Sequence, residues 1–304
     1  MKAMRYHAYD APLQLEDVPT PQPAADEVLI RVADVSVNPF DAKVRAGAFK
    51  GTLPKAFPAT PGLEAAGVAT AVGAEVEGVA VGDQVYAKVS AGYAEFALAK
   101  SNEIARKPPR LSFPEAAAVP VAIETAWSVL FDVAGLQRGQ RVLVNGAAGS
   151  VGSVAVQLAK WKGALVFGTA SPDNLDFVRT LGAEPVDYTT TSLASVVTDI
   201  DVIFDTVGGA EQDGLFATMR KGGVLVSIVR PPSQALAKER GVRALGRFGT
   251  TDPLTIRKTQ HLVDDGIVRP TVRRLFPLED ANAAEALSQS GRGRGKVVLH
   301  VWDP

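Results

Sequence analysis

The sequence predicts an α/β protein with two domains, one rich in short strands and one built on a doubly wound parallel sheet. Its 304 residues suit two domains, because a single domain commonly holds about 100–200 residues. The first part of the chain carries short strand-like segments divided by glycine and proline. From Gln140 onward, near-continuous apolar segments alternate with helical ones, which is the pattern of βαβ units.

The β-rich part contains segments of strand character that turn residues separate roughly every 8 to 12 residues. They are Val28–Val32, Gly67–Val72, Asp83–Val89 and Tyr93–Leu98. This spacing favours a compact barrel or sandwich. Ser112–Ala134 follows as a predicted helix, because Ser112 is a suitable N-cap and apolar residues then recur at helical spacing.

The second part alternates buried strands with helices. The predicted strands are Val142–Asn145, Leu165–Thr169, Val202–Asp205 and Val224–Val229, and the helices are Ser150–Lys162, Asn174–Leu181 and Ala210–Met219. The segment Gly241–Phe248 is predicted as the last strand, at the edge of the sheet. The tail contributes two helices, Leu254–Asp265 and Leu278–Ser290, and a final strand, Lys296–Val301.

Composition argues against several classes of protein. The net charge is −1, from 32 basic and 33 acidic residues, so we expect neither nucleic acid nor an anionic membrane as partner. No apolar run approaches the roughly 20 residues that span a bilayer. The N-terminal residues lack the apolar stretch of a signal peptide, which favours a cytoplasmic protein.

Metal chemistry is not expected. The chain has no cysteine, which excludes disulfides and thiolate chemistry. Its three histidines, His7, His261 and His300, are widely separated and fit no ligand spacing. Since tetrahedral zinc sites usually draw on cysteine and histidine, we predict that no zinc is bound.

The sharpest local motif is the glycine-rich turn Asn145–Gly152, between a buried strand and a helix. One glycine makes the tight turn, one lets the backbone approach a pyrophosphate, and one lets helix and strand pack closely. The helix N-terminus then offers N–H groups to the phosphates. A tight turn without a ligand is the alternative, but the flanking strand and helix favour dinucleotide binding. The residues predicted to contact the dinucleotide are Gly146, Ala148, Gly149, Ser150, Val151 and Gly152.

The end of the second parallel strand favours NADPH over NADH. An NAD enzyme usually carries a carboxylate there, bonded to the ribose 2′-hydroxyl. Here Thr169 and Ala170 stand at that place, and Ser171 can donate to a 2′-phosphate. Ser171 could instead be only a helix N-cap before Pro172, and Asp173 could still turn toward the ribose.

With these motifs the chain resembles the medium-chain dehydrogenase/reductase superfamily, in its zinc-free quinone oxidoreductase branch. The resemblance covers essentially the whole chain. It implies a GroES-like β-barrel catalytic domain, residues 1–120 and 252–304, and a Rossmann NADP-binding domain, residues 121–251, with the active cleft between them. The matching segments are Val37–Gly47, Pro61–Gly67, Val81–Val85, Gly92–Glu95, Asn145–Gly152 and Arg294–Leu299.

The resemblance also implies roles for individual residues. Asn38, Lys43 and Thr125 would line the cleft around the nicotinamide. Some relatives carry tyrosines where Lys43 and Phe49 stand and use one as proton donor, so Lys43 or a bound water would have to protonate the product here. Asn174 replaces a Lys or Arg that many relatives use for the 2′-phosphate. The other residues that would contact the cofactor are Thr169, Tyr188, Val207, Ser227, Ile228, Arg294 and Lys296.

The function this implies is hydride transfer from NADPH to quinones or α,β-unsaturated carbonyls without zinc. One alternative is a trans-2-enoyl thioester reductase, which would need a basic surface such as Lys50 and Lys55 could offer. Another is an NADPH-binding sensor or structural protein of low turnover. Relatives commonly dimerise through the edge strand, so we expect a homodimer, unless the charges of Arg243 and Arg247 keep that edge free.

Overall fold

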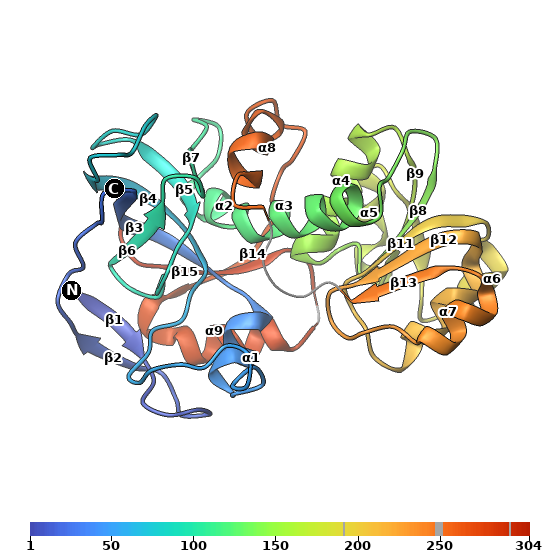
Figure 1. Cartoon of the computed structure of the whole chain (residues 1–304), viewed down its shortest axis with the longest axis horizontal. Coiled ribbons are helices and arrows are strands. Elements are labelled where there is room, and N and C mark those ends of the chain that lie inside the picture. Colours follow the sequence, from blue (N-terminus) through green and yellow to red (C-terminus); the bar gives the residue numbers. More distant parts are fainter. Residues whose placement is uncertain (191, 247–251, 292) are drawn as a thin grey trace.

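The computed structural model describes residues 1–190, 192–246, 252–291 and 293–304. Two bodies lie along the long axis of the molecule, with the N-terminal strands and the C-terminus in one and the β8–β13 sheet in the other (Figure 1). Helix α3 (Pro120–Trp127) runs between them (Figure 1). The α/β fold with two domains is confirmed.

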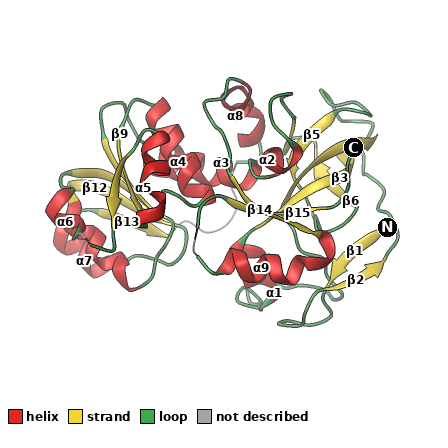
Figure 2. Cartoon of the chain, turned by 180° about the vertical axis from the view of Figure 1, so that it is seen from behind, coloured by secondary structure: helices red, strands yellow, loops and turns green. Residues whose placement is uncertain are grey.

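The first body is a barrel-like sheet with strand order β14-β15-β3-β4-β5-β7, and β6 pairs with β3. Register shifts between β3 and β4 let the long β3 bend across this sheet. A separate hairpin, β1 with β2, lies against it, and helix α9 crosses below (Figure 2). The strands are β1 (Lys2–Arg5), β2 (Gln14–Asp17), β3 (Glu27–Val37), β4 (Glu64–Val72), β5 (Gln84–Lys88), β6 (Phe96–Lys100), β7 (Ile104–Arg106), β14 (Val272–Pro277) and β15 (Lys296–His300), with helices α1 (Pro39–Arg45), α8 (Thr255–Asp264) and α9 (Ala281–Gln289).

The second body is a parallel sheet with strand order β10-β9-β8-β11-β12-β13, the doubly wound Rossmann order. Its strands are β8 (Arg141–Asn145), β9 (Leu165–Ala170), β10 (Glu184–Asp187), β11 (Ile200–Asp205), β12 (Met219–Ser227) and β13 (Arg243–Gly246), with helices α4 (Ser150–Trp161), α5 (Leu175–Thr180), α6 (Leu193–Val196) and α7 (Gln234–Arg240).

Alternate residues of the central strands enter two different cores. Phe204 and Val226 pack with α3 and α4 residues, whereas Ile203 and Leu225 pack with Leu215 and Phe216 on the other face. Burial on both faces explains why these strands have near-continuous apolar sequences. The strand order reverses next to β8, so its carboxyl end is the place where the fold binds ligands.

Two predicted helices differ from the structure. The segment 112–134 is divided into α2 (Phe113–Ala117), α3 and a π-helical end, Ser128–Val133, with Pro120 at the start of α3 because proline suits the first helical turn. Ala210–Thr218 is a 3₁₀ segment, and Met219 already belongs to β12. The short strand β10, whose four residues include a proline, was not predicted.

The expectation that no segment has the length of a membrane span was wrong. Among the described residues, the stretch Phe113–Val133 is long enough and apolar enough to cross a membrane, judged by length and composition only. Yet 67% of its most apolar window is buried inside the protein. It therefore has the character of a core helix.

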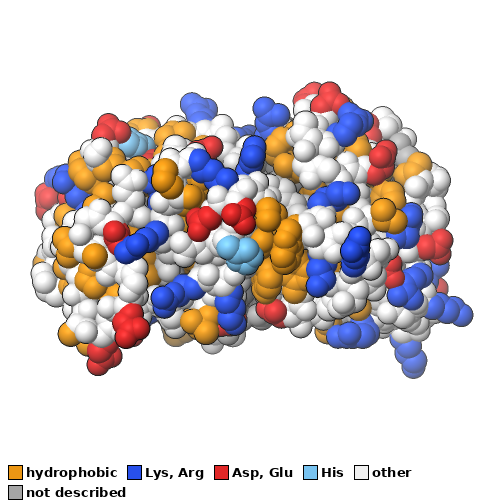
Figure 3. Space-filling model, turned by 90° about the horizontal axis from the view of Figure 1, so that it is seen from above, with side chains coloured by type: hydrophobic (Ala, Val, Ile, Leu, Met, Phe, Trp, Pro, Cys, Tyr) orange, Lys and Arg blue, Asp and Glu red, His pale blue; other side chains and the backbone are white. Residues whose placement is uncertain are grey.

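On the face seen from above, basic and acidic side chains are interspersed (Figure 3).

Helix α3 contacts β4 and β5 of the barrel as well as α4 of the Rossmann sheet. The boundary between residues 120 and 121 stays a prediction, because it falls inside this shared helix. The predicted edge strand is confirmed as β13, which pairs with β12 at the end of the described sheet. Arg247 and Phe248, which the prediction included, lie outside the described residues.

Candidate active site

Glycine is present at three positions of the turn after β8 for three different structural reasons. Gly146 has φ +84°, and a side chain there would meet Thr206. A Cβ on Gly152 would lie 2.1 Å from the Gly146 carbonyl oxygen, so only glycine allows α4 to pack this closely. A Cβ on Gly149 would meet only that oxygen, at 3.4 Å. The fold therefore tolerates a side chain at Gly149, and its absence leaves the backbone open to a ligand.

Helix α4 begins at this turn with Gly149 as its N-cap and no side chain capping it. The N–H groups of Ser150, Val151 and Gly152 belong to the first turn, which has no intrahelical acceptors. Ala148 is buried, and its carbonyl accepts a hydrogen bond from Gly295 N at 3.0 Å. An uncapped helix of twelve residues behind an open glycine fits the pyrophosphate of a dinucleotide.

The residues expected at the ribose lie beside this turn. Ser171 occupies the N-cap position before Pro172, but its side chain makes no capping hydrogen bond. Its Oγ accepts from Asn174 Nδ2 at 2.8 Å, so the hydroxyl hydrogen remains for another acceptor. Asn174 is turned inward and only 8% exposed, whereas Asp173 is exposed.

Arg294 and Tyr188 stand near this place from two different segments. The Arg294 guanidinium lies 5.3 Å from the centre of the Phe177 ring, on the helix that follows Ser171. Tyr188 is exposed directly after β10, the strand beside β9. A cationic donor beside α5 and a phenolic donor after β10 suit a phosphate on the ribose.

The carboxyl ends of β9, β8, β11 and β12 are joined by buried side chains. Thr169 Oγ1 accepts from Gly146 N at 2.9 Å and donates to Asn145 Oδ1 at 2.7 Å. Asn145 Nδ2 donates to Asp205 Oδ1 at 2.8 Å, and Ser227 Oγ donates to Asp205 Oδ2 at 2.9 Å. Thr169 and Ser227 are therefore fixed within the protein. Of the other predicted contacts, Val207 is exposed and Ile228 is half-buried.

On the barrel side, Asn38 and Lys296 meet in a buried cluster. Lys296 Nζ donates to Asn38 Oδ1 at 2.6 Å and to Glu64 Oε1 at 2.8 Å. Asn38 Nδ2 donates to Glu64 Oε1 at 3.0 Å. The Lys296 ammonium is thus committed to the barrel, and its contact with cofactor stays a prediction. One N–H of the Asn38 amide has no partner among the described residues.

Glu64 ties this cluster to the helix between the domains, because its Oε2 accepts from Val121 N at 2.8 Å. Thr125 lies one turn further along α3 and is half-buried. Beneath Asn38, burial raises the pKa of Asp41 to about 7, against the opposing hydrogen bond from Asn38 N. The structure thus brings Asn38 and Lys296 together and places Thr125 on the helix that Glu64 contacts.

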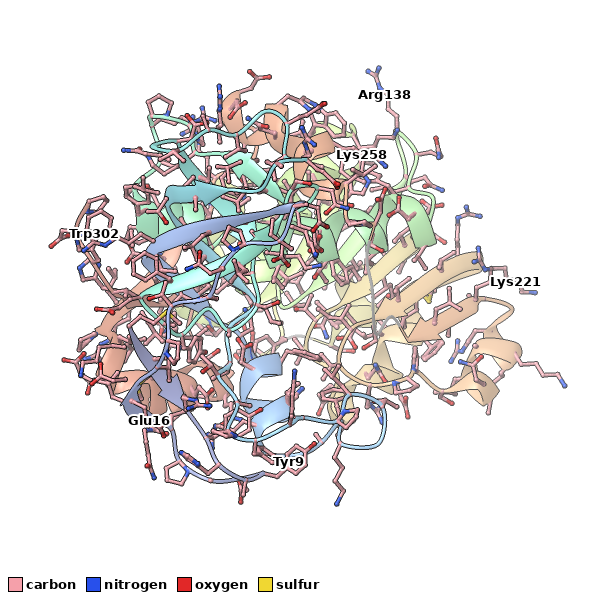
Figure 4. The ribbon with its side chains drawn as sticks, turned by 60° about the vertical axis from the view of Figure 1, so that its left-hand side comes forward. Tyr9, Glu16, Arg138, Lys221, Lys258 and Trp302 are labelled. Carbon is pink, nitrogen blue, oxygen red and sulfur yellow. The ribbon has the colours of Figure 1, made fainter. Side chains whose placement is uncertain are left out.

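Helix α1 presents Lys43 to solvent, together with aromatic rings. Phe40 is 38% exposed, and its ring centre lies 5.1 Å from that of Phe49. The loop that follows is held by Tyr9, whose hydroxyl accepts from Lys55 N at 3.0 Å. Tyr9 lies below α1 (Figure 4). An exposed cation beside an aromatic pair is suited to a flat, polar substrate.

The described residues contain no group of three His, Cys, Asp or Glu side chains that could hold a metal ion. Residues 24–109 match the family model of the alcohol dehydrogenase GroES-like domain, and residues 181–299 match that of a zinc-binding dehydrogenase. The latter name describes the family, since this chain has none of the cysteines that zinc-dependent members use.

Two curated relatives match almost the whole chain. A 2-methylene-furan-3-one reductase from Solanum lycopersicum is 35% identical, over 99% of this chain and 79% of that protein. A chloroplastic NADPH-dependent alkenal/one oxidoreductase from Arabidopsis thaliana is 34% identical over the same shares. The solved quinone oxidoreductase from Coxiella burnetii superposes with a TM-score of 0.87 and 32% identity, covering 99% of each chain.

The chain belongs to the medium-chain dehydrogenase/reductase superfamily, in its quinone oxidoreductase branch. The resemblance inferred from the motifs is thereby confirmed, as is its GroES-like and Rossmann architecture. The members of this branch named above are oxidoreductases, and this chain is an enzyme of that class.

Four residues of the site were absent from the sequence prediction: Glu64, Asn145, Asp205 and Gln212, whose Nε2 donates to Asp205 Oδ2 at 2.8 Å. Glu64 and Asn145 stood inside quoted motifs without a role. Asp205 ends an apolar strand, and a carboxylate at the end of a parallel strand next to the glycine turn was the signal that could have found it. Gln212 gave no signal in the sequence.

Proposed function

We propose that this protein transfers a hydride from NADPH to quinones or α,β-unsaturated carbonyls without a metal ion. The observation that carries the proposal is the open, uncapped glycine turn, with Ser171 rather than a carboxylate at the ribose position. The names of the relatives, an alkenal/one oxidoreductase and a quinone oxidoreductase, agree in the type of acceptor.

The cofactor would supply the hydride, and the protein's own residues would bind and orient it. The first turn of α4 would hold the pyrophosphate, and Ser171, Tyr188 and Arg294 would hold the 2′-phosphate. To reach the phosphate, the Arg294 guanidinium would move away from the Phe177 ring. It would then lose a cation–π contact and gain a charge-assisted hydrogen bond.

At the other end, the remaining N–H of Asn38 would donate to the substrate carbonyl. The Lys296 ammonium on Asn38 Oδ1 fixes the amide orientation and polarises it, which strengthens that donor. Phe40 would contact the flat substrate, and Lys43 or a water bound by it would deliver the proton after hydride transfer.

A substrate panel tests the proposal. Quinones, enones and trans-2-enoyl thioesters are assayed with NADPH and with NADH, before and after treatment with a chelator. We expect turnover of quinones or enones with NADPH, unchanged by the chelator. Preferred turnover of the thioester would favour the alternative reductase, and binding of NADPH without turnover would favour a sensor.

The cofactor preference has its own test. Ser171→Asp should weaken NADPH far more than NADH, because the new carboxylate repels the 2′-phosphate. Asp173→Asn, a charge change on the same turn but on an exposed side chain, serves as control. Equal loss of both cofactors in Ser171→Asp would reduce Ser171 to a structural role.

We also propose that the protein is a cytoplasmic homodimer joined through β13. The edge of β13 leaves backbone N–H and C=O groups that a second copy could pair, across a twofold axis. Light scattering should give twice the chain mass, and Leu245→Pro should lower it by removing a donor. A monomeric wild type would exclude this assembly. Cell fractionation tests the location, and we expect the protein in the cytoplasmic fraction.

A further inference from the structure

Asp205 is a fully buried carboxylate at the carboxyl end of β11. Its Oδ1 accepts from Asn145 Nδ2 at 2.8 Å, Val207 N at 3.1 Å and Gly208 N at 3.0 Å. Its Oδ2 accepts from Gln212 Nε2 at 2.8 Å and Ser227 Oγ at 2.9 Å. All five of these donors are neutral groups.

A buried charge is costly unless hydrogen bonds replace its hydration. Five donors from four segments provide that replacement, and each becomes fixed relative to the same two oxygen atoms. A neutral apolar residue would fill the same place in the sheet without ordering these segments. The role of the Asp205 carboxylate is therefore to order the four segments that donate hydrogen bonds to it.

Two loops at the cofactor end of the sheet are ordered by these bonds. The loop after β11 is held by the bonds from Val207 N and Gly208 N. The glycine turn is held through Asn145, whose Oδ1 binds Thr169, which in turn binds Gly146 N. The two loops also meet directly, since Thr206 Oγ1 donates to Asn145 O at 2.7 Å.

We propose that Asp205 is a positioning residue, whose carboxylate sets the loop after β11 against the glycine turn and so shapes the seat of the nicotinamide half of the cofactor. The adenosine end, at Ser171 and Arg294, lies outside these hydrogen bonds. The inference rests on the proposed use of NADPH.

Asp205→Ala removes all five bonds and tests the proposal by titration with two ligands. The affinity for NADPH should fall by about tenfold or more, because several ordering hydrogen bonds are lost together. The affinity for adenosine 2′-monophosphate, which lacks both the nicotinamide half and the pyrophosphate that the glycine turn would hold, should change by less than about twofold. Asp205→Asn keeps one acceptor oxygen for the loop and should recover much of the NADPH affinity.

Asp34→Ala is the matched control, because Asp34 is an equally buried carboxylate in the barrel, bonded to His300 and remote from both loops. It should leave both affinities unchanged. If Asp205→Ala does not fold, the same titrations on Asp205→Asn decide, with a smaller but still selective loss for NADPH expected.

The outcomes separate the two proposals. A wild type that does not bind NADPH overturns the proposed function and this inference with it. A wild type that binds NADPH, with an Asp205 variant that binds it equally well, overturns the inference alone. Equal loss of both ligands also overturns it, because that result indicates general destabilisation.

Discussion

The barrel and the Rossmann sheet each bury a carboxylate completely, and they stabilise it in different ways. Glu64 in the barrel shares a cation, Lys296, with the Asn38 amide and also accepts from a backbone N–H. Asp205 in the sheet has five neutral donors, three of them from side chains. Glu64 therefore depends on one strong partner, and Asp205 on many weaker ones.

The difference follows from where the partners come from. Lys296 is 232 residues from Glu64 and arrives on the last strand, so the ion pair closes the barrel with the C-terminal segment. The donors to Asp205 stand at the ends of neighbouring parallel strands or in the loops beside them. Removing one group should therefore have unequal effects in the two halves.

The largest effect is expected in the barrel. Lys296→Met leaves Glu64 buried without its cation, and breaking such a pair from one side costs about 3–5 kcal/mol of unfolding free energy. The double variant Lys296→Met with Glu64→Gln should recover most of this, because no buried charge remains. Urea denaturation measures both, and equal losses in the two variants would show that the pair is not the cause.

A smaller effect is expected at Asp205. Ser227→Ala removes one of five donors to a charged group and should cost about 1.5 kcal/mol. Ser36→Ala is the control, since Ser36 is equally buried but donates to a neutral carbonyl, that of Ala117, and should cost about 1 kcal/mol. A loss at Ser227 as large as that at Lys296 would remove the distinction between the two sites.

The smallest effect is a dependence on pH beneath the barrel cluster. Burial raises the pKa of Asp41 from 3.8 to about 7, so the unfolded chain loses this proton at lower pH than the folded protein. The contribution is present below pH 4 and is lost as the pH rises toward 7. Asp41→Asn should therefore gain stability relative to wild type by about 1 kcal/mol between pH 6 and pH 7. Parallel stability curves for the two proteins would contradict the assignment.

The sequence allowed the parts of the site that depend on local spacing to be predicted. The turn Asn145–Gly152 lies where a strand meets a helix, Gly146 has a positive φ, and side chains at Gly149 or Gly152 would meet the carbonyl of Gly146 within the same turn. The edge strand β13 was recognisable because its place after β12 follows from the order of the strands in the sequence. Ser171 was expected at the end of the second parallel strand, and it directly follows β9, which pairs with β8; its role at the ribose stays a prediction.

The buried charges could not be predicted in this way. Glu64 and Lys296 carry no local sign of each other, since their pairing depends on β15 joining β3 in the barrel. Asn38 was expected to face a ligand, and the structure shows most of its amide engaged by these two residues. The break in segment 112–134 was missed because its apolar spacing continues across Pro120.

One backbone contact bears on protein engineering. Gly295, from the barrel segment before β15, donates to Ala148 and pairs with Gly149, so the rim of the glycine turn is completed by a strand from the other domain. A chimera that exchanges only residues 121–251 between relatives would separate these partners. Residues 293–295 have to travel with the Rossmann domain if the donor's cofactor preference is to be transplanted intact.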